Sequence, residues 1–461
     1  SVSNTTAMRV RRRSLGGASD GFCNFDSKLT DYKITSPESP YGRDIVKQLA
    51  DACHRGGVLW GVYYSQPDWR HPDYLAGDEA HKRYIKYFQG QVRELLTGYG
   101  RVSMIFFDGL AGKSETWDAP TLINMCRELQ PGVMINNRAG VPADCDTPEQ
   151  VIGKMQTNRP WETCMTIGDQ WAWKPNDRIK SSRQCIQTLV RVVTGDGNLL
   201  FNVGPMPDGR IEPRQVARLK EMGEWLKKNG QSIYDTRGGP FVAGQWGGST
   251  YRDSTVYVHV LDGGAKPIVL PPMDKKILSH EVLTGGKATV VQTDDSITLT
   301  LDPSARNDVD TIVALTLDAP AADAKVGHLA SESVAAGKKA TASNVYQNEV
   351  REYGPEQAFD DDPATRWATD AGTKTAWLEV DLGEPTTIDR VMIDEAYGHR
   401  VRRFELSVDA DGTWKTVVQG RQLGEQFTAQ FAPVATQKVR LNILDAADGP
   451  TITELHLLAP K

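Results

Sequence analysis

A repeated alternation of helical stretches and short apolar runs, between about residues 43 and 235, constrains this chain more than any other feature. Amphipathic stretches predict helices over Asp44–His54, Glu79–Thr97, Ala119–Leu129, Ser181–Thr194 and Glu212–Asn229. Apolar runs lie between them at Val58–Ser65, Val102–Asp108, Gly132–Asn137, Asn198–Gly204 and, more weakly, Trp161–Thr166. Apolar runs that alternate with helices are typical of parallel strands buried on both faces. The pattern predicts an α/β fold, either doubly wound or a (βα) barrel, with fewer strands than the eight of a full barrel.

After Tyr234 the pattern changes to short segments of alternating apolar and polar residues, such as STVYVHVL, SITLTL and DTIVALTL. Such alternation predicts antiparallel β structure, with one face buried and one in water. We therefore predict a catalytic α/β part over 20–238, a small antiparallel β domain over 239–318, a linker over 319–328 and a β sandwich over 329–461. Residues 1–19 form an aberrant segment that fits none of these domains.

Composition excludes several classes of protein. The chain has 53 Lys and Arg against 59 Asp and Glu, a formal net charge of −6, which argues against a strongly basic nucleic-acid binder. No run approaches the roughly 18 apolar residues of a membrane-spanning helix. The six cysteines show no CxxC pair or zinc-ligand spacing, so we expect buried free thiols, with one disulfide as the alternative in an exported protein.

Polar side chains follow the predicted strands at their C-terminal ends, where parallel α/β folds build their sites. VSMIFFDG ends with Asp108, and LWGVYYS ends with Tyr63 and Tyr64. VMINNR ends with Arg138, and LLFNVGP contains Asn202. Taken alone, Asp108 is more simply explained as a helix cap or a loop anchor.

The segments that follow favour a catalytic site over a structural role for these residues. Acids and tryptophans are concentrated between residues 141 and 173: Asp144, Asp146, Glu149, Glu162, Trp161, Trp171 and Trp173. Carboxyl groups beside aromatic rings suit sugar chemistry, because the rings stack on a pyranose and exclude water from one acid. The alternative is an acidic surface loop with tryptophans in the core.

An ordered set of motifs then carries a family resemblance. The strings are DGFCNFDSKLTDY, RDIVKQLADACHRGG, GVYYSQPDW, FFDG, INNRAGVPADCDTPEQ, PWETCMTIGDQWAW and GDGNLLFNVGPMPDGRIEP. From Asp20 to about Arg237 the chain resembles the α-L-fucosidases of glycoside hydrolase family 29. The resemblance implies a (βα) TIM-like barrel, here N-terminally incomplete, followed by a β sandwich. It also implies hydrolysis of terminal α-linked L-fucose with retention of configuration, and fucosylated glycans or glycoconjugates as partners.

The resemblance also assigns roles to residues. Asp108 matches the nucleophile that forms the glycosyl-enzyme ester, and Glu149 is our choice for the acid/base, with Glu162 as its rival. Tyr64, Trp69, Arg138 and Trp171 match substrate-binding positions. The reaction needs no metal or cofactor. The glycan substrate predicts a secreted or periplasmic protein.

The chain departs from the family near its beginning. Two strands that carry fucose-binding histidines are not recognisable, and Ala18 and Ser19 stand where two histidines are expected. We expect these opening residues to come from a mispredicted start or a reading-frame error. The alternative function is therefore a catalytically impaired relative that binds carbohydrate through its C-terminal domain.

That C-terminal domain carries a second resemblance. AFDDDPATRWAT and AWLEVDLG resemble the discoidin-type domains of coagulation factors 5 and 8, which in carbohydrate enzymes are binding modules of family 32. The resemblance implies a structural calcium at Asp360, Asp362, Thr365 and Glu454, with a metal-free acidic turn as the alternative. We expect Trp367 and Trp377 in the core. Sugar-binding loops are predicted around Tyr346, Tyr397, His399 and Arg400.

Overall fold

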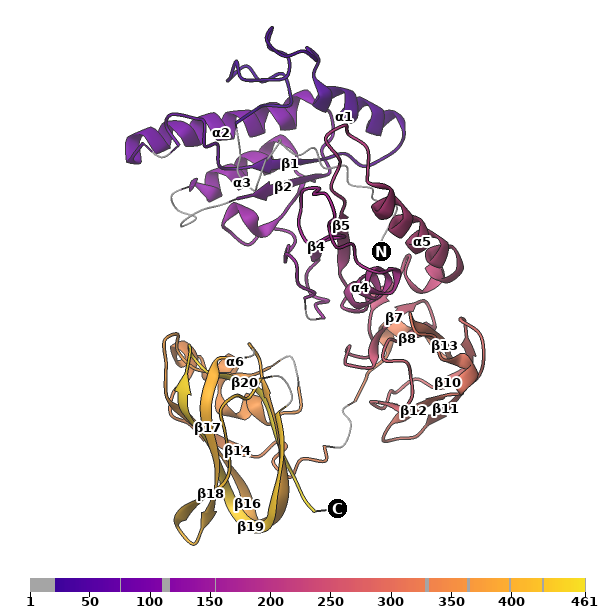
Figure 1. Ribbon diagram of the computed structural model, residues 1–461, viewed down its shortest axis with the longest axis vertical. Coiled ribbons are helices and arrows are strands. Elements are labelled where there is room, and N and C mark those ends of the chain that lie inside the picture. The colour runs from indigo at the N-terminus through magenta and orange to yellow at the C-terminus, as the bar shows by residue number, and fades with distance from the viewer. Residues whose placement is uncertain are drawn as a thin grey trace. The chain divides into compact units, whose positions relative to one another are not determined.

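The computed structural model describes residues 21–74, 76–109, 117–153, 155–327, 331–362, 365–397, 399–424 and 427–460 (Figure 1). Its contacts divide the chain into two compact units, with the boundary between residues 328 and 329. Each unit is therefore treated by itself, as the first and the second unit. The segment 1–19, with Ala18 and Ser19, lies outside the described residues.

The first unit begins with helices and parallel strands in alternation. The helices are α1 (Ile45–Arg55), α2 (Asp78–Gly98), α3 (Ala119–Leu129), α4 (Ser182–Thr194) and α5 (Pro213–Asn229). The strands are β1 (Gly61–Ser65), β2 (Met104–Asp108), β3 (Met134–Ile135), β4 (Glu162–Thr166) and β5 (Asn198–Asn202). These elements lie where the sequence predicts them, and their ends differ by a few residues because turns and caps fix them. At α4, for example, Ser181 and Gln184 form a reciprocal capping box.

The parallel strands form two short sheets, ordered β1-β2-β3 and β4-β5. The extended segment from Cys145 to Glu149 links them through single parallel bridges to Asn136 on one side and to Trp161 and Cys164 on the other. The parallel α/β prediction is confirmed. Among the described strands, however, the pairing gives two linked sheets and not a closed barrel.

One face of β1 and β2 is covered by α2, which runs along these strands in Figure 1. Phe88 of α2 packs against Tyr64 of β1 and Phe107 of β2, with ring centroids 5.5 and 6.3 Å apart. Because successive strand residues point to opposite faces, this packing turns Tyr63, Phe106 and Asp108 toward the other face.

The first unit ends in an antiparallel β part, as predicted. Its strands are β6 (Arg237–Gly238), β7 (Gly247–Arg252), β8 (Thr255–Val260), β9 (Ile268–Leu270), β10 (Ile277–Val282), β11 (Ala288–Gln292), β12 (Ile297–Leu301) and β13 (Thr311–Leu317). They form sheets ordered β10-β13-β8-β7-β6 and β11-β12-β9 around one apolar core. The predicted linker 319–328 needs correction, because Ala321 is buried in that core and Val326 bridges to Met273.

The second unit is all β, as predicted, apart from the short helix α6 (Val350–Tyr353) and 3-10 turns. Its strands are β14 (Lys339–Ala342), β15 (Trp367–Ala368), β16 (Ala376–Glu395), β17 (Val401–Ala410), β18 (Thr413–Gly420), β19 (Phe427–Ala446) and β20 (Thr451–Leu458). The sheet order is β15-β20-β16-β19-β17-β18, with β14 also paired to β16. Trp367 lies in the core as expected. The expectation for Trp377 is wrong, because its ring lies on the outer face against the guanidinium of Arg440.

No helix in the described part of the chain is long and apolar enough to cross a membrane.

Candidate active site

Asp108 ends β2 on the face that α2 leaves uncovered. The parallel register pairs Ser65 with Asp108 and Tyr63 with Phe106, so Tyr63 lies on the same face as the carboxylate. The Tyr63 hydroxyl donates a hydrogen bond to Oδ2 of Asp108. Nη1 of Arg138 donates to Oδ1 at 2.9 Å. Each oxygen of Asp108 therefore accepts a hydrogen bond from a donor fixed by a neighbouring element.

Arg138 joins Asp108 to a second carboxylate. The same Nη1 atom lies 2.7 Å from Oε2 of Glu149. Nε and Nη2 of Arg138 bond the hydroxyl and the carbonyl of Thr147 at 3.1 and 2.9 Å, which fixes the plane of the guanidinium. Asn137 completes this frame, since its side-chain oxygen accepts from the Thr147 amide at 3.2 Å.

The position of β3 beside β2 depends on one buried amide. Asn136 accepts from the Phe107 amide at 2.9 Å and donates to the Phe107 carbonyl at 3.0 Å. Its side chain thus continues the β2–β3 ladder beyond the last paired residues of the two strands. This contact places the residues after Asn136, including Arg138, beside the end of β2.

The electrostatics favour an ionised Asp108. Burial by itself raises the pKa of this carboxyl, but the hydrogen bonds from Tyr63 and Arg138 and the charge of Arg138 outweigh burial and hold the pKa below its usual value. Burial likewise lowers the pKa of Arg138, and its contacts with Asp108 and Glu149 outweigh that effect and raise it. Asp108 is therefore suited to act as a charged group and not as an acid.

A cavity of about 230 Å³ opens over these groups. It is lined by Tyr63, Phe106, Asp108, Arg138, Glu149, Cys164, Trp171, Leu200 and Asn202. Polar groups therefore converge on a space whose remaining walls are largely apolar. Pockets for drug-sized ligands are larger, roughly 300–1,000 Å³, so this cavity suits one small polar ring with an apolar side.

The structure brings four of the predicted site residues together and leaves three elsewhere. Asp108, Arg138, Glu149 and Trp171 line the cavity. Tyr64 needs correction: it points to the opposite face of β1, where it is buried and donates to Gln91 at 2.7 Å. Trp69 is 62% exposed and does not line the cavity. Glu162 starts β4 and lines a different cavity, at the N-terminal ends of the strands.

Sequence reasoning did not select Phe106, Cys164 and Leu200, and it named Tyr63 and Asn202 only as polar residues at strand ends. Strand alternation could have found Phe106. Phe106 is two residues before Asp108 on β2, so it must share the face of the carboxylate. Tyr63 follows from the β1–β2 register, which the sequence alone does not give. Cys164 and the other five cysteines are buried thiols, as predicted, and the described part of the chain contains no disulfide between them.

A close approach of two loops positions Trp171. Asn202, at the end of β5, donates to the Trp171 carbonyl at 2.9 Å. The next turn passes so near the tryptophan loop that a Cβ on Gly204 would lie 2.5 Å from the Trp173 amide nitrogen. Glycine is therefore required at 204 for this loop to close over the cavity.

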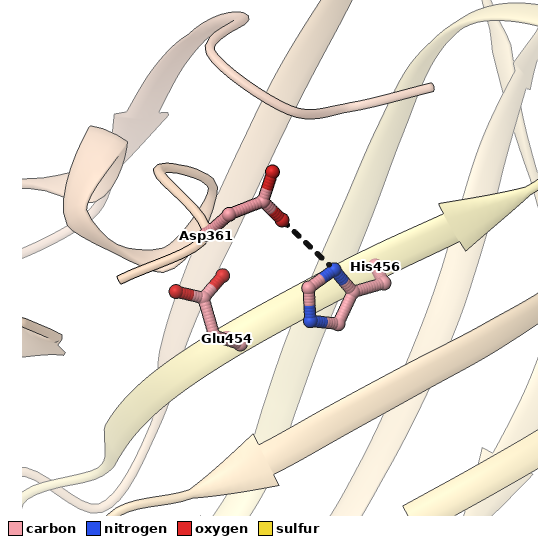
Figure 2. Close-up of side chains that lie close together, drawn as sticks. All are labelled: Asp361, Glu454 and His456. Carbon is pink, nitrogen blue, oxygen red and sulfur yellow. Dashed lines mark ion pairs between the residues drawn. The ribbon is translucent and has the colours of Figure 1, made fainter. Parts of the chain in front are cut away.

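Calcium is expected at Asp360, Asp362, Thr365 and Glu454, which lie in and around one acidic turn. The Thr365 hydroxyl lies 2.9 Å from both carboxylate oxygens of Asp360, 3.0 Å from the Asp362 carbonyl oxygen and 3.2 Å from the Gln357 carbonyl oxygen. Glu454 is buried near Asp361 (Figure 2), and burial with the charges of Asp360 and Asp361 raises its pKa. Oxygen atoms are the ligands that calcium takes. Calcium at this turn stays a prediction.

A cluster of aromatic and cationic side chains occupies the predicted sugar-binding loops of the second unit. Arg400 lies 4.6 Å and Arg366 lies 5.5 Å from the centroid of the Tyr397 ring, which is 50% exposed. Arg366 also lies 5.0 Å from the ring of Tyr353. This arrangement offers an exposed aromatic face with donors around it.

Comparison with known families gives two matches. Residues 18–231 match the family model described as Alpha-L-fucosidase, and residues 339–456 match the model described as F5/8 type C domain. An alpha-L-fucosidase of Branchiostoma floridae is 30% identical over 276 residues, which cover 53% of this chain and 59% of that protein. The human plasma alpha-L-fucosidase is 31% identical over 214 residues, covering 42% and 45%. The chain thus spans about half the length of the curated relatives it matches.

Solved structures of alpha-L-fucosidases are also similar to this chain. An alpha-L-fucosidase isoenzyme 1 from Paenibacillus thiaminolyticus is 34% identical, with a TM-score of 0.57 and coverage of 65% of this chain and 81% of that one. A GH29 alpha-L-fucosidase from Bacteroides thetaiotaomicron, trapped as a covalent intermediate with 2-fluoro-fucosyl fluoride, is 26% identical with a TM-score of 0.58. In that comparison 65% of this chain and 76% of that one are covered.

Proposed function

We propose that this chain, which belongs to the alpha-L-fucosidase family, is a retaining exo-glycosidase that removes terminal α-L-fucose from glycans. One observation carries the proposal: a single atom of Arg138 contacts both Asp108 and Glu149 in the wall of a small cavity. Most glycosidases use two carboxyl groups that face the same cavity.

The separation of the two carboxylates supports retention. Because Nη1 of Arg138 lies 2.9 Å from Oδ1 of Asp108 and 2.7 Å from Oε2 of Glu149, those oxygens are at most about 5.6 Å apart. Retaining glycosidases hold their carboxyl groups about 5–5.5 Å apart, and inverting ones about 6.5–9.5 Å. The covalent intermediate trapped in the Bacteroides relative also favours a double displacement.

In this mechanism Asp108 is the nucleophile. Its lowered pKa keeps the carboxylate charged, and the donors from Tyr63 and Arg138 fix its orientation. An oxygen of Asp108 attacks the anomeric carbon, and the bond from that carbon to the glycosidic oxygen breaks. The product of this step is a fucosyl ester on Asp108.

Glu149 is the acid/base. As the glycosidic bond breaks, its proton goes to the departing oxygen, so the aglycone leaves as an alcohol. In the second step Glu149 takes a proton from water, whose oxygen attacks the anomeric carbon and releases Asp108. Its side chain is 41% exposed, against 29% for Asp108, which leaves room for an aglycone and then for water.

The cavity lining supports a 6-deoxy sugar. Fucose carries a methyl group where most hexoses carry a hydroxymethyl group, and a methyl group gains free energy only against apolar walls. Phe106, Trp171 and Leu200 supply such walls, and Asn202 supplies polar atoms for ring hydroxyls. A glycan substrate of this kind also favours a secreted or periplasmic location.

The second unit supports a glycan-binding role, and by itself it is the basis of the alternative function. The exposed Tyr397 ring with Arg366 and Arg400 beside it is a surface on which a sugar ring can stack while guanidinium groups donate to its hydroxyls. The match to the F5/8 type C family model agrees with a separate binding module.

The test is release of 4-nitrophenol from 4-nitrophenyl α-L-fucoside by the full chain and by Asp108→Asn. We expect turnover that falls by at least about a thousandfold in the variant, with unchanged circular dichroism. Proton NMR of the first-formed product should show the α anomer. A folded chain without turnover that still binds fucosylated glycans would favour the alternative, a binding protein.

A further inference from the structure

The backbone on either side of Glu149 is hydrogen-bonded to β4. The Cys164 amide donates to the Pro148 carbonyl at 3.1 Å, and the Gln150 amide donates to the Cys164 carbonyl at 2.9 Å. These two bonds form the parallel bridge that pairs Glu149 with Cys164. Residues paired across neighbouring strands point to the same face of a sheet. Because Cys164 lines the cavity, the bridge also turns Glu149 toward it.

The residue after Glu149 has an unusual backbone conformation. Gln150 has a φ of 59°, in the left-handed region. Residues other than glycine rarely adopt this region, and asparagine and aspartate tolerate it better than glutamine does. Among the described residues, Glu149 is the last of its segment in a bridge to β4, so the extended path of the chain stops at this turn. Such strain persists only where surrounding contacts hold it, and it is concentrated at functional sites.

Two side-chain hydrogen bonds hold Gln150 in this conformation. Its Oε1 accepts from the Thr166 amide at 3.3 Å, and its Nε2 donates to the Thr166 hydroxyl at 3.2 Å. That hydroxyl donates to the Gly168 carbonyl at 2.7 Å, so its oxygen is available to accept from Gln150. Thr166 is buried at the end of β4. The pair of bonds, called here the Gln150–Thr166 clamp, therefore ties the turn to a fixed part of the sheet.

The side chain of Glu149 has little else to orient it. Among the described residues, its one hydrogen bond is the contact between Oε2 and Nη1 of Arg138 at 2.7 Å. An acid/base needs an oxygen free for the departing group and then for water, so more bonds to its carboxyl group would interfere with proton transfer. Its direction must therefore come from the backbone, which the bridge to Cys164 and the clamp hold.

We propose that Gln150 is a positioning residue that directs Glu149 toward the glycosidic oxygen. The inference rests on the proposed function, in which Glu149 is the acid/base. Gln150 is not among the described residues that line the cavity, so it acts through the backbone of Glu149. Loss of the clamp should slow proton transfer to the departing group. It should leave Asp108 charged, because Tyr63 and Arg138 still donate to it.

The experiment compares the full chain with Gln150→Gly on two substrates, 4-nitrophenyl and methyl α-L-fucoside. Glycine adopts a positive φ readily, so this variant removes the clamp without adding strain. Nitrophenolate leaves with little help from an acid, whereas the methyl fucoside needs a proton on its departing oxygen. General acid catalysis contributes roughly 10²–10⁴-fold, so kcat/KM should fall at least about tenfold more for the methyl fucoside. The acid limb of the pH profile should stay that of wild type.

Threonines on the two faces of β4 give matched variants. Thr166→Val removes the hydroxyl that accepts from Gln150, so it should show the same selective loss, whereas Thr166→Ser keeps that hydroxyl and should keep the wild-type ratio of the two rates. Thr163→Val is the control for a structural effect. The Thr163 hydroxyl donates to the Val151 carbonyl at 2.6 Å from the other face of β4. This variant should lose stability and keep the wild-type ratio.

Circular dichroism and thermal melts show whether each variant folds. If Gln150→Gly does not fold, the comparison of Thr166→Val with Thr166→Ser decides. Equal losses on the two substrates in Gln150→Gly, or the same selective loss in Thr163→Val, would overturn this inference and leave the proposed function standing. No turnover of either substrate by the wild-type chain would overturn both.

Discussion

Replacing Tyr63 with phenylalanine removes one hydroxyl from the candidate active site and little else. That hydroxyl donates to Oδ2 of Asp108, while Arg138 holds Oδ1 at 2.9 Å. The phenylalanine ring can keep the stacking on Phe106, whose centroid lies 5.7 Å from that of Tyr63. The variant therefore tests whether a neutral donor helps to keep Asp108, the proposed nucleophile, charged.

The size of the effect follows from the hydrogen bond. A bond to a charged group contributes roughly 1.5–3 kcal/mol, and one pKa unit corresponds to about 1.36 kcal/mol. The loss of Tyr63 should raise the pKa of Asp108 by about one to two units. We expect the lower end, because Arg138 remains and the Asp108 side chain is 29% exposed, so water can replace part of the lost bond.

The sign of the pH effect is set by the charged form. In the proposed mechanism Asp108 acts as a carboxylate, so activity should be present above its pKa in the folded protein and should be lost as the pH falls through that pKa. A higher pKa in Tyr63→Phe moves the acid limb of the kcat/KM profile to higher pH by about one unit. The assay is a pH series of kcat/KM with an aryl α-L-fucoside.

The neighbouring tyrosine gives a matched control. Tyr64→Phe removes the same hydroxyl from the other face of β1, where it donates to buried Gln91 at 2.7 Å. This variant should lose about 0.5–1.5 kcal/mol of stability, because it loses one buried hydrogen bond, and should keep the acid limb of wild type. An unchanged acid limb in Tyr63→Phe, or an equal shift in both variants, would refute the role assigned to the Tyr63 hydroxyl.

Three further changes test other parts of the site. Glu149→Gln should lower kcat/KM by roughly 10²–10⁴-fold for glycans with poor leaving groups and much less for aryl fucosides, whereas Glu162→Gln should leave both rates near those of wild type. Gly204→Ala places a Cβ 2.5 Å from the Trp173 amide nitrogen, so it should displace the tryptophan loop and raise KM, measured by steady-state kinetics. Asn136→Ala leaves an amide and a carbonyl of β2 unpaired in the interior, and should lower the unfolding midpoint by several degrees in a thermal melt.

The sequence predicted the position of the site better than its lining. Apolar runs ending in polar residues correctly indicated which strand ends meet, and Asp108, Arg138 and Glu149 do converge. The choice of Tyr64 failed because two adjacent tyrosines end the same strand, and only the pairing with β2 decides which faces the cavity. Register is a property of two strands, so one strand's sequence could not give it.

In the second unit the sequence indicated the acidic turn but not the arrangement of its oxygen atoms. The Thr365 hydroxyl lies beside the carboxylate of Asp360 and the carbonyls of Asp362 and Gln357. Carbonyl positions depend on the path of the backbone through the turn, so a motif of side chains could not give them.

The environments of Asp108 and Glu149 fit the two different roles that we propose for them. Asp108 sits at a strand end, with a donor on each oxygen and a guanidinium held flat by Thr147, so it is the group kept charged and aligned. Glu149 shares that guanidinium through one oxygen only and is more exposed, at 41% against 29%. A nucleophile needs a fixed charge, whereas an acid/base needs access to the aglycone and then to water. The asymmetry around Arg138 therefore supports the proposal that Asp108 attacks the sugar and that Glu149 transfers the proton.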